Sequence, residues 1–96
     1  MTLKRVHIFI YGRVQGVFFR QSTFEMAQQY NLTGYVRNRM IGSVEAIFEG
    51  DEEMVVKMVE WCKTGPPHAS VQGVEIVTSE PISTKLYQFF SIESTH

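Results

Sequence analysis

A change of hydrophobic period across two glycines constrains the fold of this chain more than any other feature. Residues 6–11, VHIFIY, are rich in β-formers on both faces of a two-residue alternation, which predicts a central strand with both faces at least partly covered. Apolar or small side chains then recur at helical spacing, at Phe19, Thr23, Met26, Ala27 and Tyr30. They predict a helix over 20–31, closed at Asn31 because a left-handed residue commonly ends a helix.

The loop between this strand and this helix is a candidate anion site. Gly12 and Gly16 lie four apart, and Arg20 stands where the helix begins. Glycines allow close backbone approach to a ligand, and a cation near the positive end of a helix dipole is unfavourable unless an anion lies beside it. The spacing is neither GxGxxG nor a Walker loop. Two interpretations stay open: an anion cradle, or an ordinary turn in which Arg20 pairs with an acid such as Glu25 or a C-terminal carboxylate.

Beyond Asn31 the two periods continue to alternate. The pattern predicts two strands, a second helix and two further strands, at residues 32–39, 43–49, 51–63, 71–77 and 86–93. We expect residues 40–42 to form a hairpin turn with Gly42 left-handed, and Gly65 to close the second helix. Residues 79–85, SEPISTK, are expected to be a loop.

This order of elements predicts an α+β fold. Strand, helix, strand, strand, helix and strand, with the last strand divided into 71–77 and 86–93, make the ferredoxin-like βαββαβ sandwich, an antiparallel sheet with both helices on one face. Right-handed crossovers place the first and third strands side by side at the centre. The loop after the first strand then lies beside the end of the second strand, where Asn38 falls. Asn38 can serve that loop or simply start the hairpin.

Composition limits the classes of function. The 96 residues are expected to form one domain, 1–96. Nine basic and ten acidic residues give a net charge of −1, so no overall field attracts nucleic acid or an anionic membrane. The single cysteine, Cys62, excludes an internal disulfide and belongs to the apolar stripe of the second helix, which indicates a structural role. No cysteine and histidine spacing suggests a metal.

The N-terminus lacks the features of a targeting segment. Two positive charges are followed by only six apolar or aromatic-rich residues, which include His7. A signal peptide needs a longer apolar region and a cleavage site, and a membrane span needs roughly 18–20 apolar residues. We therefore expect a cytoplasmic protein, and we separately expect it to be a monomer.

Two motifs resemble those of the acylphosphatases. Residues 12–20, GRVQGVFFR, are similar to the family signature GRVQGVxFR at every fixed position, and residues 34–45, GYVRNRMIGSVE, to GxVxNxxDGxVE except at Ile41. The resemblance runs from Val6 to Ile92 and includes Gly65, Pro66, Ala69, Val71, Phe90, Ser91 and Ile92. It implies hydrolysis of small acyl phosphates to a carboxylate and inorganic phosphate, without metal or cofactor.

The resemblance also implies roles for individual residues. Arg20 would hold the phosphate and Asn38 would orient the attacking water. The phosphate cradle would be made by the backbone amides of Gln15, Gly16, Val17, Phe18, Phe19 and Arg20. The motifs contain no histidine, cysteine or carboxylate pair that could act as a general base, and we expect the phosphate of the substrate to accept the proton of the water.

The departure from the family pattern is Ile41, where Asp or Asn is usual. It would be the second central residue of a type I turn, which accepts most side chains, so the substitution concerns hairpin stability and leaves the site residues untouched.

Two alternatives stay open. RNA-recognition domains share this order of elements, but they need aromatic residues on the middle strands. Residues 42–49, GSVEAIFE, instead carry acids where the RNA-binding motif requires Lys, Phe or Tyr, which disfavours this alternative. A phosphate-binding regulatory domain without turnover, or a module that works on carbamoyl phosphate within a larger protein, would keep the same loop.

Overall fold

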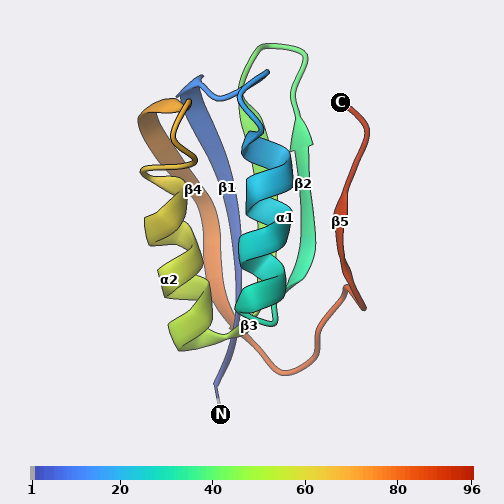
Figure 1. Cartoon of the computed structure of the whole chain (residues 1–96). Helices are drawn as coiled ribbons and strands as arrows, with labels where there is room; N and C mark the ends of the chain where they lie inside the picture. Colours follow the sequence, from blue (N-terminus) through green and yellow to red (C-terminus); the bar gives the residue numbers. More distant parts are fainter. Residues whose placement is uncertain (1) are drawn as a thin grey trace.

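The computed structural model describes residues 2–96 and contains a five-stranded sheet with two helices on one face (Figure 1). In chain order the elements are β1 (Leu3–Arg13), α1 (Phe19–Gln29), β2 (Thr33–Asn38), β3 (Val44–Asp51), α2 (Glu52–Cys62), β4 (Ser70–Ile82) and β5 (Phe90–Ile92). The strand order across the sheet is β4-β1-β3-β2-β5. Strands β1 and β3 are therefore neighbours at the centre, as predicted, and the ferredoxin-like fold class is confirmed.

One strand pair differs from the expected antiparallel arrangement. Strand β5 pairs parallel to β2, with Ile92 opposite Val36, so the sheet is mixed. The chain leaves β4 at one edge of the sheet, passes around its lower end and rises along the opposite edge (Figure 1). A three-residue strand carries too short a pattern to indicate its direction, so this pairing was not predictable from alternation.

The last two strands also differ in length from their predictions. Strand β4 continues through Ile82, into the segment 79–85 that was expected to be a loop, because it pairs with the early part of β1 from Leu3 onward. The strand expected at 86–93 is reduced to Phe90–Ile92. Its first amides, those of Leu86 and Tyr87, donate instead to the buried carboxylate of Glu49 at 3.0–3.1 Å.

The ends of the first helix lie close to their predicted positions. Helix α1 ends at Gln29, and Asn31 has a φ of 58°, the left-handed conformation expected of the closing residue. Thr23 and Ala27, two members of the predicted stripe, are fully buried. Neither helix of the described chain, residues 2–96, is long and apolar enough to cross a membrane.

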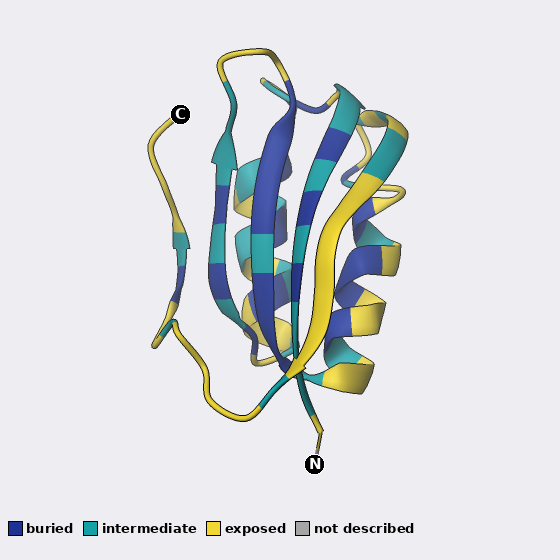
Figure 2. Cartoon of the chain, turned by 180° about the vertical axis from the view of Figure 1, so that it is seen from behind, coloured by how far each residue is buried: buried dark blue, intermediate teal, exposed yellow. Residues whose placement is uncertain are grey.

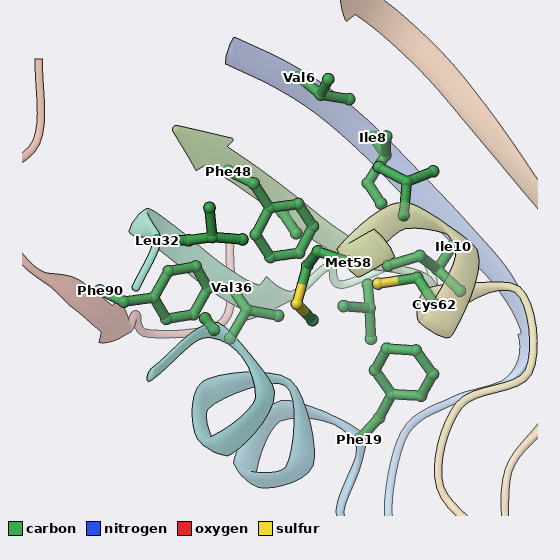
Figure 3. Close-up of a cluster of buried hydrophobic side chains, with 14 of the residues drawn as sticks. Val6, Ile8, Ile10, Phe19, Leu32, Val36, Phe48, Met58, Cys62 and Phe90 are labelled. Atoms are coloured by element: carbon green, nitrogen blue, oxygen red, sulfur yellow. The ribbon is translucent and has the colours of Figure 1, made fainter. Parts of the chain in front are cut away.

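The hydrophobic core lies between the helices and the sheet (Figure 3). Phe19 enters it from the start of α1 and Met58 from α2, and the rings of Phe48 and Phe90 stack with centroids 5.6 Å apart. Cys62 has no exposed surface, and burial raises the pKa of its thiol. Its position in the core supports the structural role inferred from the helical stripe.

The other face of the sheet carries two buried carboxylates on β3, the strand that is dark blue along most of its length in Figure 2. Glu49 is completely buried and accepts a hydrogen bond from Arg5 Nε at 2.7 Å. Glu45 accepts one from Arg37 Nε at 2.6 Å and lies 2.6 Å from Nε2 of His7. Buried charges are tolerated when they are paired and hydrogen-bonded, so these acids join β1, β2 and β3.

Candidate active site

The loop between β1 and α1 presents uncapped backbone amides at the start of the helix. Gly16 and Phe18 both have left-handed backbones, with φ of 74° and 64°. Phe18 is the N-cap residue, its side chain accepts no hydrogen bond from the first amides of the helix, and the first turn of α1 contains no acid. Because the first amides of a helix have no intrahelical acceptor, and alternating left-handed residues turn successive N–H groups toward one side, this loop is a ready site for an anion.

Arg20 and Asn38 line one hollow beside these amides. The hollow has a volume of about 350 Å³, and its lining consists of Val14, Gly16, Phe18, Phe19, Arg20, Gln21, Asn38 and Ile92. Sequence reasoning placed Arg20 on α1 and Asn38 on β2, and the structure brings the two together. Of the six residues expected to form the cradle, Gly16, Phe18, Phe19 and Arg20 line the hollow.

No acid in the described part of the chain neutralises the guanidinium of Arg20. Within residues 2–96 it forms no ion pair, and Glu25, the acid considered as its partner, accepts a hydrogen bond from Gln21 Nε2 at 3.2 Å instead. A cation thus stands without a counter-charge at the positive end of a helix dipole, which is unfavourable by about 0.3–1 kcal/mol. The arrangement favours an anion in the hollow over the alternative of an internal ion pair.

Asn38 is the last residue of β2 and is paired with Val44 across the hairpin. Its backbone oxygen accepts a hydrogen bond from the amide of His96 at 3.0 Å. Its side-chain Oδ1 is buried and has no hydrogen-bond partner among the described residues. The hairpin turn does not use this side chain, because the turn is closed through Arg39, whose backbone oxygen accepts from Gly42 N at 3.0 Å. Leaving a buried acceptor without a donor costs free energy. Because no donor of the described residues reaches Oδ1, this atom is available to accept a hydrogen bond from a water or a ligand.

Two predicted cradle residues have side chains directed elsewhere. Val17 is 5% exposed and belongs to the core. Gln15 donates both hydrogens of Nε2, to the backbone oxygens of Arg39 and Ser43 at 2.8 and 2.9 Å. Its carboxamide therefore braces the loop against the hairpin that begins just after Asn38. The expectation for these two residues concerned their backbone amides, which remain part of the proposed cradle.

Three lining residues were not predicted. Val14 and Gln21 lie in or next to the loop motif, and their positions follow once the loop is folded. Ile92 comes from β5, which reaches the hollow only through its parallel pairing with β2. The sole signal for it was its place in the C-terminal part of the resemblance, at Phe90, Ser91 and Ile92.

Comparisons with known proteins agree with this geometry. The acylphosphatase family model matches residues 6–92. The acylphosphatase of Rubrobacter xylanophilus is 55% identical over 80 residues, which cover 83% of this chain and 72% of the relative. Two solved structures also match. An acylphosphatase from Coxiella burnetii has a TM-score of 0.85 at 35% sequence identity, and the match covers 96% of this chain and 94% of that structure. The acylphosphatase from Bacillus subtilis has a TM-score of 0.86 at 36% identity, and the match covers 94% of this chain and 98% of that structure. The chain belongs to the acylphosphatase family.

Membership of the acylphosphatase family confirms the function class inferred from the two motifs: the chain is an acylphosphatase, a hydrolase. RNA-recognition domains share the arrangement of strands and helices but belong to other families, so the family match favours the enzyme over this alternative. Within residues 2–96 no group of three or more His, Cys, Asp or Glu side chains is placed to hold a metal ion.

The departure from the acylphosphatase pattern, Ile41, lies at the tip of the hairpin. Met40 and Ile41 are the two central residues of the turn, and Gly42 follows with a φ of 104°. Ile41 is 73% exposed and does not line the hollow with Arg20 and Asn38. The positive φ therefore falls on glycine as expected, and the unusual side chain is directed to the surface.

Glu45, the last residue of the second acylphosphatase motif, supports the strand that carries Asn38. Burial raises its pKa, but hydrogen bonds from Arg37 and His7 outweigh burial, so the pKa lies below its ordinary value of 4.5. A depressed pKa in the folded state means that the carboxylate stabilises the fold above about pH 4.5 and that this contribution is lost as the pH falls through the folded value.

We expect Glu45→Gln to lower the free energy of unfolding at pH 7 by about 1–3 kcal/mol, because Arg37 loses its buried counter-charge. The loss should shrink as the pH is lowered below about 4.5 and through the depressed pKa of the folded protein, because the wild-type carboxylate then becomes neutral as well. Urea unfolding at a series of pH values measures this difference. The exposed Glu75→Gln is the matched control, and an equal response of both variants at pH 7 would contradict the assignment.

Proposed function

We propose that this acylphosphatase hydrolyses the carboxyl–phosphate bond with Arg20 holding the phosphate, Asn38 orienting the water, and the amides of residues 15–20 forming the cradle. One observation carries the proposal: a guanidinium and a buried amide oxygen that have no partner among residues 2–96 line the same hollow as the uncapped start of α1. A cation and free N–H groups suit a phosphate, and a lone acceptor suits a water.

Arg20 supplies the fixed charge of the site. A planar guanidinium can donate to two phosphate oxygens at once and stays protonated at any working pH. Each charge-assisted hydrogen bond contributes about 1.5–3 kcal/mol, and more where negative charge develops in the transition state. The loop amides add donors that are already oriented, because the left-handed backbones of Gly16 and Phe18 hold them in place.

Asn38 supplies the position of the nucleophile. Its Oδ1 can accept a hydrogen bond from a water and so aim an oxygen lone pair of that water at phosphorus. The carboxamide does this without a negative charge, which would repel the phosphate. Positioning a reactant in this way removes much of the entropic part of the barrier.

The reaction balances without a protein base. The water oxygen bonds to phosphorus, the bond from phosphorus to the bridging oxygen breaks, and the carboxylate leaves with the electron pair. Among the described residues, the lining of the hollow contains no His, Cys, Asp, Glu, Lys or Tyr side chain. A phosphate oxygen of the substrate therefore accepts the proton of the water, and a good leaving group makes this sufficient.

Benzoyl phosphate tests the proposal. We expect the purified chain to release inorganic phosphate with saturable kinetics, to be inhibited competitively by inorganic phosphate, and to keep its activity in the presence of EDTA. The pH–rate profile should show no step that traces to a protein side chain. Phosphate release no faster than the spontaneous background would overturn the proposal.

We further propose that the enzyme works as a cytoplasmic monomer without a metal or cofactor.

A further inference from the structure

Phe18 occupies an unfavourable position that packing does not explain. Its backbone is left-handed, with φ 64° and ψ 22°, a conformation that side chains other than glycine, asparagine and aspartate rarely adopt. Phe18 as a residue is 74% exposed, whereas the next residue, Phe19, is 1% exposed and lies in the core. The left-handed turn thus sends two adjacent phenylalanines in opposite directions. The cradle explains the left-handed backbone but not the residue type, because glycine or asparagine would adopt this backbone at lower cost, so the large exposed side chain indicates a function of its own.

The exposed ring belongs to the hollow that holds Arg20 and Asn38. Phe18 lines this hollow from the loop, and Ile92, 39% exposed, lines it from β5. Strand β5 places Ile92 opposite Val36, two residues before Asn38 on β2. Val14 and Phe19, the other large apolar residues of the lining, are buried, with exposures of 1% each. Phe18 and Ile92 are therefore the apolar surfaces of the hollow that face solvent.

The connectivity of an acyl phosphate brings its organic group to these two side chains. When the phosphate lies against Arg20 and the loop amides, the acyl carbon is only one bridging oxygen away from phosphorus. The substituent on that carbon then extends away from the cradle, toward the solvent-facing side of the hollow. The polar part of the lining, with Arg20, Gln21 and Asn38, suits the phosphate and the water, and the apolar part is left for the substituent.

We propose that Phe18 and Ile92 form an apolar rim that binds the organic group of the substrate and selects acyl phosphates with aromatic or larger aliphatic acyl groups over acetyl phosphate. This proposal rests on the proposed function, because it assumes that the phosphate occupies the cradle. The ring of Phe18 is the specificity-determining part, and the backbone of the same residue belongs to the cradle.

The test is the ratio of kcat/KM for benzoyl phosphate to kcat/KM for acetyl phosphate. Phe18→Asn removes the ring, and asparagine tolerates the left-handed backbone, so the loop keeps its conformation. We expect the ratio to fall about fivefold to tenfold, as for a loss of roughly 40–55 Å² of apolar contact. Phe18→Tyr, which keeps the ring, should retain the wild-type ratio within about twofold, and Ile92→Thr should lower the ratio by a smaller factor in the same direction.

Phe89→Asn is the matched control. Phe89 is 77% exposed but does not line the hollow, so its replacement should leave the ratio unchanged. An unchanged ratio in Phe18→Asn, or an equal fall in Phe89→Asn, would overturn the rim while the proposed function stands. Failure of the wild-type chain to hydrolyse either substrate would overturn both, so the two failures are distinguishable.

Discussion

Arg20→Gln is expected to lower kcat/KM for benzoyl phosphate by about 10²–10⁴-fold and to abolish inhibition by inorganic phosphate. The variant loses two charge-assisted hydrogen bonds to the phosphate, each worth about 1.5–3 kcal/mol. Because Arg20 has no acid partner within residues 2–96, its removal breaks no internal ion pair. The free energy of unfolding should therefore not fall, and should rise by about 0.3–1 kcal/mol because an unfavourable cation is removed from the helix N-terminus, which denaturant unfolding measures alongside the kinetics.

Arg13→Gln is the matched control for the loss of one positive charge. Arg13 ends β1 and is exposed, and it does not line the hollow. We expect its variant to keep kcat/KM and phosphate inhibition within about twofold, since exposed charges at a distance are screened by salt. If Arg20→Gln retained most of the activity, or if Arg13→Gln lost as much, the phosphate would not be held by Arg20.

Asn38→Ala is expected to lower kcat by about 10²–10³-fold while the inhibition constant of inorganic phosphate changes by less than about threefold. The fall is of the size found when one oriented polar group of an active site is removed. Phosphate affinity persists because Arg20 and the loop amides are unchanged. The variant should not be less stable by more than about 0.5 kcal/mol, because Oδ1 has no hydrogen bond to lose within the described chain.

Asn38→Asp separates the position of the water from the charge of the site. It keeps an acceptor oxygen but adds a negative charge beside the phosphate, so it should weaken phosphate inhibition as well as turnover, unlike the alanine variant. Gln28→Ala, which removes an exposed carboxamide from α1, controls for nonspecific loss. Equal weakening of phosphate binding by Asn38→Ala and Asn38→Asp would contradict a role for Asn38 that is limited to the water.

The first half of the chain could be predicted closely because its signals are local. The helical stripe through Thr23 and Ala27, the left-handed Asn31 and the hairpin glycine Gly42 each depend on residues a few positions apart. The second half depends on distant partners. Glu49, fully buried on β3, takes the amides of Leu86 and Tyr87 out of the expected strand, and no local pattern indicates an interaction across 37 residues.

The candidate site shows the same division. The sequence alone determined the glycine loop, the position of Arg20 at a helix start and the family, because residue type and short spacing are properties of the chain before it folds. Only the tertiary structure decided that Ile92 reaches the hollow and that, within the described residues 2–96, Arg20 has no acid partner and the buried Asn38 Oδ1 has no donor. These are relations between residues on different elements, and they exist only once the sheet has set α1, β2 and β5 beside one another.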